Sequence, residues 1–478
     1  MAEQITPRSQ DYSRWYTDVI QKTDLADYAP VKGCMVIKPY GFTLWENIKE
    51  GLDRRFKETG HVNAYFPLLI PLSFIQKESE HVAGFSPELA VVTHGGGTRL
   101  EDPLVVRPTS ETIIGHMYAK WIQSYRDLPL LINQWANVVR WEMRTRPFLR
   151  TTEFLWQEGH TAHATEKEAL EETLRMLDVY VEFAEEDAAI PVIAGRKSDS
   201  DKFAGAVNSY TMEALMGDFK ALQAGTSHFL GQNFAKAFDI QYLDENNERQ
   251  YVWTTSWGVS TRMVGAVVMV HGDDQGLILP PRLAPHQVVI VPIWKDEDQH
   301  AMVMETVERV KGLLGRDVRI HVDDRDAYSP GWKFNEWEMR GAPLRIEISP
   351  RDVEQDQVML VRRDLTGRAR KQTAHIGDGL AESVHEVLDQ IQSHLFQKAL
   401  DFQEAHTYRA QNYDEFREMV TRGFVEAWWC GDDGCEARIK EDTKATIRCI
   451  PLEQGSGTGR CIRCGNDAKE RAVFARAY

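Results

Sequence analysis

The chain has 478 residues, which exceeds what one hydrophobic core usually serves, so we expect roughly two to four domains. Hydrophobic residues make up 42% and charged residues 27% of the sequence, and no apolar run approaches the roughly 20 residues of a membrane helix. The polar N-terminal sequence has no apolar signal core. These features argue against an exported or membrane-bound protein and predict a cytoplasmic one with no membrane partner.

The formal net charge of −16 disfavours a nucleic-acid partner, because neutralising phosphates requires lysine and arginine. Local patches nevertheless decide binding. Two arginine-rich segments, residues 140–150 and 362–371, interrupt the acidic background, and the first is interleaved with Trp141 and Phe148. A nucleic-acid partner is therefore compatible with the sequence, and solvated surface arginines are the alternative.

The first predicted elements alternate between helix and strand. Residues 46–59 place Ile48, Leu52 and Phe56 at helical spacing. The pattern further predicts strands at 64–71 and 104–108, a helix at 111–123 whose start is capped by the hydroxyls of Thr109 and Ser110, and strands at 134–142 and 152–160. The last two strands flank an arginine-rich loop, which predicts an antiparallel hairpin.

A strongly amphipathic helix is predicted at residues 166–187, and three extended segments follow at 191–196, 209–216 and 221–230. Antiparallel strands with interspersed helices predict an α+β core. The proline-rich segment 279–285 predicts a domain boundary. Beyond it, alternating strands and helices predict a small, mainly parallel α/β domain, and a charged helical stretch at about 380–425 leads to a cysteine-rich region.

The six cysteines are unevenly distributed, because Cys34 stands alone and the other five lie near the C-terminus. In a chain without an export signal this clustering indicates a metal before a disulfide. The pairs Cys430-x4-Cys435 and Cys461-x2-Cys464 suit a tetrahedral structural zinc site with four thiolates, which leaves Cys449 out. Unligated buried cysteines are the alternative.

Residues 138–158 carry Arg140-x-Glu142, a loop, and Arg150-Thr151-Thr152-x-Phe154. This segment resembles motif 2 of class II aminoacyl-tRNA synthetases. Activating an amino acid needs charge stabilisation at the α-phosphate of ATP, and a fixed guanidinium supplies it, so Arg140 is the candidate catalytic residue. A surface hairpin with salt-bridged arginines is the alternative.

Residues 256–269 resemble motif 3, which places an arginine at the start of an apolar helix. Arg262 is then a catalytic ligand of the γ-phosphate, assisted by the helix dipole. Arg282 is a rival, which we reject because it lies in the predicted domain boundary. Motif 1 corresponds to residues 46–67, with Pro67 at the seam of a homodimer.

Six further strings narrow the resemblance: RPTSE (107–111), FLWQEGHTAH (154–163), LQAGTSHFLGQNF (222–234), TSWG (255–258), HGDDQGLILPPRLAP (271–285) and PGWKFNEWEMRGAPLRIEISPRD (330–352). Together they resemble prolyl-tRNA synthetases of the archaeal/eukaryotic-like type over nearly the whole chain. The resemblance implies an antiparallel-sheet catalytic domain at 1–284, an anticodon-binding α/β domain at 285–400 and a small zinc-binding α+β domain at 401–478.

The same resemblance implies a ligase that activates L-proline with ATP and Mg²⁺ and transfers it to tRNA(Pro). The ammonium of proline needs acceptors in an apolar slot. The implied proline contacts are Thr109, Glu111, Arg140, Trp156, Glu158, His228, Ser256 and Gly258. The implied ATP contacts are Arg140, Glu142, Arg150, Thr151, Thr152, Phe154, Gln223, Thr226, Ser260 and Arg262. Phe154 would stack on adenine.

The proline anticodon presents two guanines, which are read by hydrogen-bond donors and by an acidic group. Glu338, Arg345 and Arg351 are the candidates, and surface ion pairs are the alternative reading. In related enzymes a terminal tyrosine places its carboxylate near the active site; without the resemblance Tyr478 would be a frayed end.

Two other functions remain as rivals. A threonyl enzyme would need zinc ligands in the active site, which the TSE and GTSH strings do not offer. A non-catalytic tRNA sensor could lose Arg140 or Arg262, and both are present. The segment between Phe154 and Arg262 has no room for a large editing domain, so we expect detectable activation of cysteine and alanine.

Overall fold

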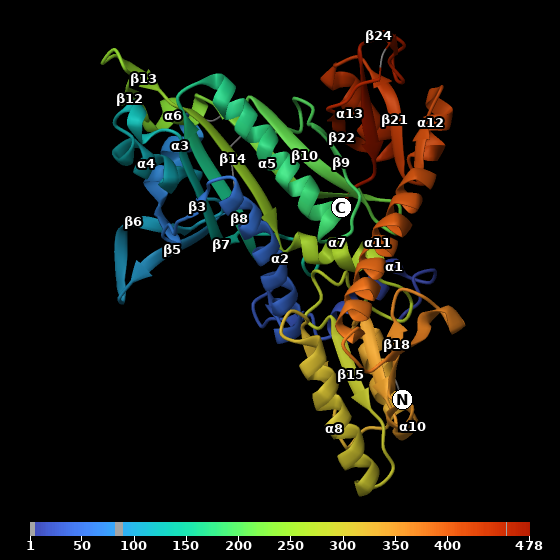
Figure 1. Ribbon diagram of the computed structural model, residues 1–478. Coiled ribbons are helices and arrows are strands. Elements are labelled where there is room, and N and C mark those ends of the chain that lie inside the picture. Colours follow the sequence, from blue (N-terminus) through green and yellow to red (C-terminus); the bar gives the residue numbers. More distant parts are fainter. Residues whose placement is uncertain (1–4, 82–88, 456) are drawn as a thin grey trace.

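The computed structural model describes residues 5–81, 89–455 and 457–478. Figure 1 shows an N-terminal part built on a large sheet, a middle part at the bottom of the view, and a C-terminal part at the upper right. A long helix, α11 (Leu380–Ala405), leads from the middle part to the C-terminal part. None of the described helices is both long and apolar enough to span a membrane.

The N-terminal part contains most of the elements. Its helices are α1 (Tyr12–Lys22), α2 (Pro39–Glu58), α3 (Leu72–His81), α4 (Glu111–Trp121), η1 (Tyr125–Asp127), α5 (Glu166–Glu186), α6 (Asn233–Phe238) and α7 (Arg262–His271). Its strands are β1 (Ala26–Tyr28), β2 (Met35–Ile37), β3 (Val62–Asn63), β4 (Leu69–Pro71), β5 (Ala90–Gly95), β6 (Thr98–Val106), β7 (Leu130–Val139), β8 (Glu153–His163), β9 (Ile193–Arg196), β10 (Asn208–Leu215), β11 (Ala221–Gly231), β12 (Gln241–Leu243), β13 (Arg249–Tyr251) and β14 (Trp253–Ser260).

The central strands form an antiparallel sheet in the order β9-β10-β11-β14-β8-β7. The predicted hairpin is confirmed, because β7 pairs with β8 and places Val138 opposite Phe154. The predicted helix at 166–187 is confirmed as α5, which a capping box of Thr165 and Glu168 begins. The sheet with its interspersed helices confirms the α+β core.

Helices α2 and α5 pack together, and α5 covers the sheet at β11 and β14. Trp257 of β14 is buried between them, with its ring 5.1 Å from that of Phe56 and 6.3 Å from that of Tyr180. Gly159 on the neighbouring strand makes room for this indole, because a Cβ there would lie 2.1 Å from the Trp257 ring. This aromatic packing forms one core of the N-terminal part.

Two local predictions in the N-terminal part are corrected. The strand predicted at 64–71 is limited to Leu69–Pro71, because only this piece pairs with β6. Ser110 does occupy the N-cap of α4, but no side-chain hydrogen bond caps the helix. The Thr109 hydroxyl instead donates to Glu111, and the Ser110 hydroxyl donates to Glu158. Hydrogen bonds to a carboxylate are stronger than those between neutral groups.

The middle part is a five-stranded sheet in the order β16-β15-β17-β18-β19. Its elements are β15 (Val288–Pro292), α8 (Glu297–Leu314), β16 (Ile320–Val322), α9 (Pro330–Met339), β17 (Leu344–Ile348), α10 (Pro350–Glu354), β18 (Gln357–Arg362), η2 (Gly367–Arg370) and β19 (Lys371–His375). The expectation of a mainly parallel sheet is only half right, because β18 and β19 are antiparallel. The polar edge strand β19 carried no apolar pattern to predict it.

The C-terminal part contains β20 (Thr407–Arg409), α12 (Tyr413–Met419), β21 (Phe424–Trp429), α13 (Asp433–Thr443), β22 (Thr446–Pro451), β23 (Gly459–Arg460), β24 (Asp467–Ala468) and β25 (Glu470–Ala475). The predicted helical stretch at 380–425 is therefore interrupted after Ala405 by β20. Packing of α12, β21, α13, β22 and β25 buries an apolar core around Phe416 and Phe474.

The C-terminal part shares its sheet with the N-terminal part. Ile450 of β22 pairs with Arg196 of β9, so the sheet continues through eleven strands from β20 to β3. Across this seam Arg448 donates to Glu213 at 3.0 Å, and both side chains are buried. A buried ion pair needs this geometry to offset the desolvation of its charges.

The chain terminus is also ordered. Tyr478 packs against the core of the N-terminal part, its backbone N–H donates to Ala221, and its ring lies 5.0 Å from the guanidinium of Arg146. The reading of Tyr478 as a frayed end is therefore wrong.

Candidate active site and cysteine cluster

A cavity of about 410 Å³ lies over the central strands of the sheet. The pairing register explains its floor. Glu158, Gly258 and Thr226 stand side by side on β8, β14 and β11, and two positions further along His160, Ser256 and His228 form the next row. Because side chains alternate along a strand, both rows point to the same face.

The cavity brings together nearly all of the predicted pocket residues. Those that line it are Thr109, Glu111, Arg140, Glu142, Arg150, Thr151, Phe154, Trp156, Glu158, Gln223, Thr226, His228, Ser256, Gly258, Ser260 and Arg262. Arg282 does not line it, and its guanidinium faces Glu186 and Asp187 at 3.9 and 3.8 Å.

Thr152 is the exception among the predicted ATP contacts. It is buried, its backbone bonds Arg140 and Gly33, and it is absent from the cavity lining. A Cβ added to Gly33 would lie 2.2 Å from the Thr152 hydroxyl, so this side chain packs against the glycine. The contact of Thr152 with ATP therefore stays a prediction.

One end of the cavity is acidic. Glu158 accepts hydrogen bonds from Ser110 and from Gln134, the latter at 2.8 Å, and lies 3.0 Å from His160 Nε2. Burial opposes ionisation of Glu158, but the hydrogen bonds from His160, Ser110 and Gln134 lower its pKa. Burial also opposes a charge on His160, yet its bond to Glu158 raises the pKa of the imidazole. This end offers carboxylates to a cation.

Ligand atoms of Glu111, Glu158 and His160 lie within 4.8 Å of one another, the arrangement of a possible cation site. Oxygens of both carboxylates already accept hydrogen bonds from Thr109, Ser110 and Gln134. Such an oxygen-rich, partly satisfied site suits an ammonium group at least as well as a metal ion.

The cavity also holds two basic side chains, Arg140, which lies near Glu111 and Glu158, and Arg262. Arg140 donates to the Pro108 carbonyl at 2.9 Å, and its guanidinium lies 5.5 Å from the Phe154 ring and 5.2 Å from the Trp156 ring. Arg262 donates to backbone carbonyls on two other segments, both at 3.2 Å. Burial and the nearby charge of Arg140 lower the pKa of Arg262 to about 10, so it remains cationic at neutral pH. The cavity therefore holds fixed positive charge.

His228 forms part of the wall beside the acidic end. Its Nδ1 lies 2.8 Å from the Ser209 hydroxyl, which itself accepts the Phe203 N–H at 2.9 Å. The direction of the hydrogen bond between Ser209 and Nδ1 depends on the tautomer of the imidazole. Burial and the charge of Lys197 lower the pKa of His228 to about 3, so the ring is neutral. It serves as a hydrogen-bonding wall.

Among the residues of the lining that sequence reasoning missed are His160, Lys197, Asp201 and Phe203. His160 lies within a string already noted, two positions after Glu158, and strand alternation was the signal that could have found it. The other three belong to the loop between β9 and β10, which has no pattern that relates it to the cavity.

The cavity also contains polar atoms without a protein partner. Trp156 Nε1 and Ser256 Oγ are buried and make no hydrogen bond within the described chain. Unpaired buried polar groups are costly, and at a binding site a ligand completes them. Because its lining combines buried carboxylates with guanidinium groups, the cavity suits a zwitterion together with a polyphosphate.

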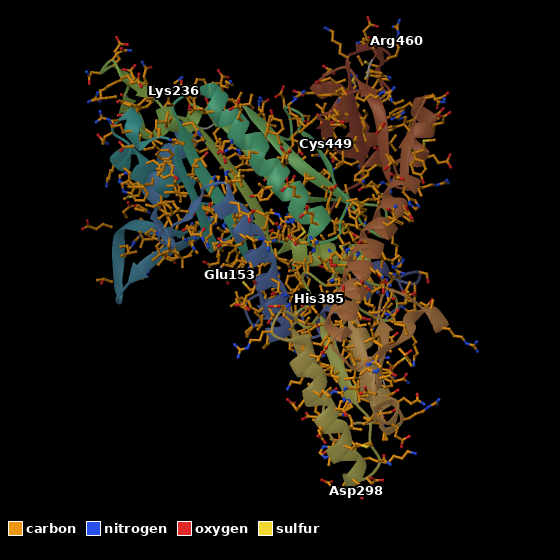
Figure 2. All side chains as sticks on the ribbon, in the orientation of Figure 1. Glu153, Lys236, Asp298, His385, Cys449 and Arg460 are labelled. Atoms are coloured by element: carbon orange, nitrogen blue, oxygen red, sulfur yellow. The ribbon has the colours of Figure 1, made fainter. Side chains whose placement is uncertain are left out.

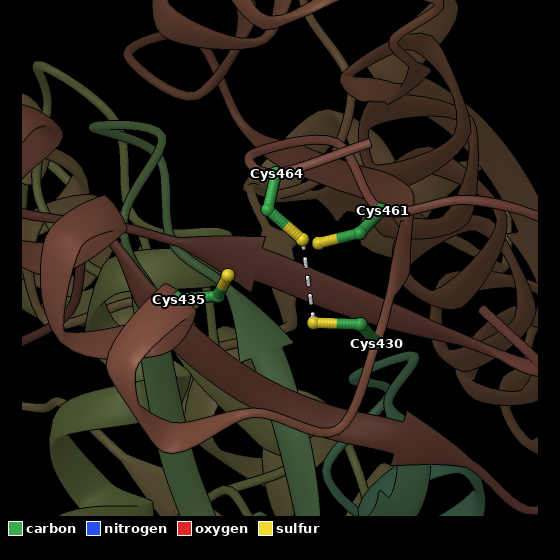
Figure 3. A group of neighbouring side chains, drawn as sticks. All are labelled: Cys430, Cys435, Cys461 and Cys464. Atoms are coloured by element: carbon green, nitrogen blue, oxygen red, sulfur yellow. Dashed lines mark hydrogen bonds between the residues drawn. The ribbon is translucent and has the colours of Figure 1, made fainter. Parts of the chain in front are cut away.

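The cysteine cluster lies in the C-terminal part (Figure 3). Cys430, Cys435, Cys461 and Cys464 converge, and their sulfur atoms lie within 4.8 Å of one another. Cys449 is not among them: it is buried in β22 near the Ile193 carbonyl, at the boundary with the N-terminal part (Figure 2). Four convergent thiols from two chain segments have the donor set of a tetrahedral zinc site.

A small recess in the middle part is lined by Trp337, Glu338, Ala342, Arg345, Val361, Arg362, Arg363 and Arg370. Glu338 receives two hydrogen bonds of 3.0 Å from Arg370, and Arg345 donates to Glu347 at 2.8 Å. Of the predicted anticodon contacts, Glu338 and Arg345 thus come together. Arg351 does not, because it lies exposed on the short helix α10.

The antiparallel sheet, the hairpin with Arg140 and the apolar helix that begins with Arg262 define a class II aminoacyl-tRNA synthetase. Comparison with known protein families agrees with this assignment. The chain matches the tRNA synthetase class II core domain (G, H, P, S and T) at residues 93–271, an anticodon binding domain at 287–383, and the C-terminal domain of prolyl-tRNA synthetase at 413–478.

Relatives that match the full length of the chain identify its family within this class. The chain is 58% identical to the proline–tRNA ligases of Roseiflexus sp. (strain RS-1) and Chloroflexus aurantiacus, covering all of this chain and 99% of each relative. It also resembles a crystal structure of prolyl-tRNA synthetase from Cryptosporidium parvum complexed with halofuginone and AMPPNP, with a TM-score of 0.93, 39% identity and 99% of both chains covered. The chain belongs to the prolyl-tRNA synthetase family.

Proposed function

We propose that this chain is a proline–tRNA ligase, which activates L-proline with ATP and transfers it to the 3′ end of tRNA(Pro). The observation that carries this function is a cavity that combines the carboxylates of Glu111 and Glu158 with the guanidinium groups of Arg140 and Arg262. Relatives that match the whole chain are proline–tRNA ligases, and the similar crystal structure contains an ATP analogue.

In the first step the carboxylate of proline attacks the α-phosphorus of ATP, the bond to the bridging oxygen breaks, and pyrophosphate leaves. The carboxylate is already ionised, so the reaction needs charge stabilisation and no general base. Glu111, Glu158 and the Thr109 hydroxyl hold the ammonium, while Arg140 lies between the carboxylate and the α-phosphate. Arg262 holds the γ-phosphate at the start of α7.

The remaining pocket residues orient the substrates. Trp156, His228, Ser256 and Gly258 enclose proline, and Gly258 leaves the space that a side chain would take from it. Phe154 stacks on adenine, and the other ATP contacts are Glu142, Arg150, Thr151, Gln223, Thr226 and Ser260. Mg²⁺ bound to ATP supplies additional positive charge at the phosphates.

In the second step a ribose hydroxyl of the terminal nucleotide of tRNA attacks the prolyl carbonyl, and AMP leaves. The recess around Glu338 and Arg345 reads the anticodon guanines, since it combines an acceptor with several donors. Arg370, which holds Glu338 in place, joins this set. Arg351 remains a candidate contact to the same tRNA from α10.

We assign residues 1–284 to the catalytic domain, 285–400 to the anticodon-binding domain and 401–478 to the zinc-binding domain. The matches to three separate family models support this division. The cysteine tail and the full-length similarity to the Cryptosporidium enzyme support the archaeal/eukaryotic-like type, although the sequence relatives named above are bacterial. A cytoplasmic location fits the role in protein synthesis.

Substituting Arg140→Ala should reduce proline-dependent ATP/pyrophosphate exchange by at least about 10²-fold, because a preorganised positive charge at the reacting phosphate is lost. Arg144→Ala is the matched control: this arginine is exposed in the same loop and does not line the cavity. Exchange that needs no proline would contradict the function, and full exchange in Arg140→Ala would contradict the role of Arg140.

Cysteine and alanine should be activated detectably by the wild-type chain. Residues 154–262 form the strands β8 to β14 with α5 and α6, which supports the expectation that the chain has no large editing insertion there. A pocket discriminates by only about 1–3 kcal/mol per methylene group. The exchange assay with each amino acid measures this, and complete rejection of both would refute the prediction.

The four convergent thiols should bind about one zinc ion per chain. Elemental analysis of purified protein should show this zinc, and Cys464→Ser should lower both the zinc content and the melting temperature. Cys34→Ser provides the control, because Cys34 lies far along the chain from the cluster. Retention of one zinc in Cys464→Ser would remove Cys464 from the ligand set.

The homodimer proposal rests on an exposed apolar edge. Strand β3 is the last strand of the eleven-stranded sheet, and Val62, Tyr65 and Leu69 near it are 61%, 72% and 40% exposed. Unpaired sheet edges and apolar patches of this kind favour association. Tyr65→Glu should shift sedimentation toward the monomer, whereas Leu452→Glu on the C-terminal part should not. A monomeric wild type at micromolar concentration would overturn the proposal.

A further inference from the structure

The loop between β9 and β10, residues 197–207, connects the C-terminal part with the amino-acid side of the cavity. Lys197, Asp201 and Phe203 of this loop line the cavity. On its other side the loop contacts α13 of the C-terminal part. The loop is therefore placed to couple the position of the C-terminal part to the shape of the cavity.

The contact with α13 is made by Glu436. This glutamate directly follows Cys435, is 7% exposed, and uses both carboxylate oxygens: Oε1 accepts the Ser198 hydroxyl at 2.9 Å and Oε2 accepts the Ser200 hydroxyl at 2.8 Å. A buried hydrogen-bonding group that loses its partner is costly. A buried carboxylate with both oxygens occupied holds the two serines in one arrangement.

The loop passes this constraint to the pocket wall. The Phe203 ring lies 4.8 Å from the His228 ring, and the Phe203 N–H donates to Ser209 Oγ, the group that bonds His228 Nδ1. Placement of Phe203 therefore sets both the packing and the hydrogen bonding of His228. Glu436 acts on this histidine through the loop and does not touch the cavity itself.

The other contacts of the loop act at other residues: the Phe203 ring stacks on Phe234 and packs against the cluster that contains Leu230. Lys197 with Asp201, and Lys202 with Asp199 at 3.0 Å, are ion pairs within the loop, so they shape it without attaching it elsewhere. The Gly205 carbonyl is held by Asn233, beyond Phe203 along the chain. Among the described side-chain hydrogen bonds, those of Glu436 are the ones that hold residues 198–200 to the C-terminal part.

The phosphate side of the cavity is held independently. Arg140 and Arg262 are positioned by the carbonyls of Pro108, Leu149 and Gln223, none of which belongs to the loop. A change in the loop should therefore affect the amino-acid side and leave the ATP side in place.

We propose that Glu436 is a positioning residue for the amino-acid pocket: by holding Ser198 and Ser200 it fixes the loop that orients Phe203 and His228 against proline. This inference rests on the proposed function for its substrate. It assigns to the C-terminal part a role in amino-acid affinity in addition to any metal binding.

Glu436→Ala and Glu436→Gln test this in the full-length chain, by proline-dependent ATP/pyrophosphate exchange with each substrate varied in turn. Loss of both anchors in Glu436→Ala should raise KM for proline roughly tenfold, with KM for ATP and kcat changed by less than about twofold. Glu436→Gln should restore most of the proline KM, because a glutamine amide still bonds two serine hydroxyls.

Glu470→Ala is the matched control. Glu470 also crosses the seam, pairing with Arg196 at 3.1 Å, but it makes no contact with Ser198 or Ser200. Its KM for proline should equal that of the wild type. An unchanged proline KM in Glu436→Ala, or equal increases in both KM values with a lowered melting temperature, would overturn the proposal.

Hydrogen–deuterium exchange of peptides covering residues 198–207 provides a readout that needs no activity. Exchange there should be faster in Glu436→Ala than in Glu470→Ala. If the wild type shows no proline-dependent exchange of pyrophosphate, the proposed function fails, while the deuterium measurement still decides whether Glu436 holds the loop. Identical deuterium uptake in all variants would refute that role.

Discussion

The register of the antiparallel sheet is the constraint on which the site depends. Backbone hydrogen bonds place Glu158 beside Gly258 and Thr226, and His160 beside Ser256 and His228, in rows two residues apart. A slip of one residue on any of these strands would turn its side chains to the opposite face. The packing of Trp257 between the sheet, α2 and α5 holds that register from behind. The arrangement of the residues proposed to bind proline thus depends on strand pairing.

Different hydrogen-bond partners hold the acidic and the basic side chains of the cavity. The acidic end is surrounded by hydroxyl and amide donors, which stabilise ionised Glu158 despite its burial. Backbone carbonyls hold Arg140 and Arg262 without neutralising them. Such preorganised charges cost no rearrangement when the reaction occurs. The same cavity therefore offers opposite charges to the two ends of a zwitterion.

The continuity of the sheet changes how the C-terminal part is understood. Its strand β22 pairs with β9, its Arg448 is buried against Glu213, and its Glu436 holds a loop that lines the cavity. A metal ion bound by the four cysteines would stabilise the packing of α13 and β21. The C-terminal part is consequently a structural extension of the active-site sheet, which its position at the end of the sequence did not indicate.

Local patterns in the sequence determined much of this protein. The hairpin with Arg140, the helix that begins at Arg262 and the paired cysteines were predictable, because strand alternation, helix periodicity and ligand spacing act over a few residues. Tertiary structure alone decided that Thr152 packs against Gly33, that Lys197 and Phe203 reach the cavity, and that Ser110 bonds Glu158 instead of capping its helix. These outcomes depend on partners tens to hundreds of residues away, whose proximity arises only when the sheet has assembled.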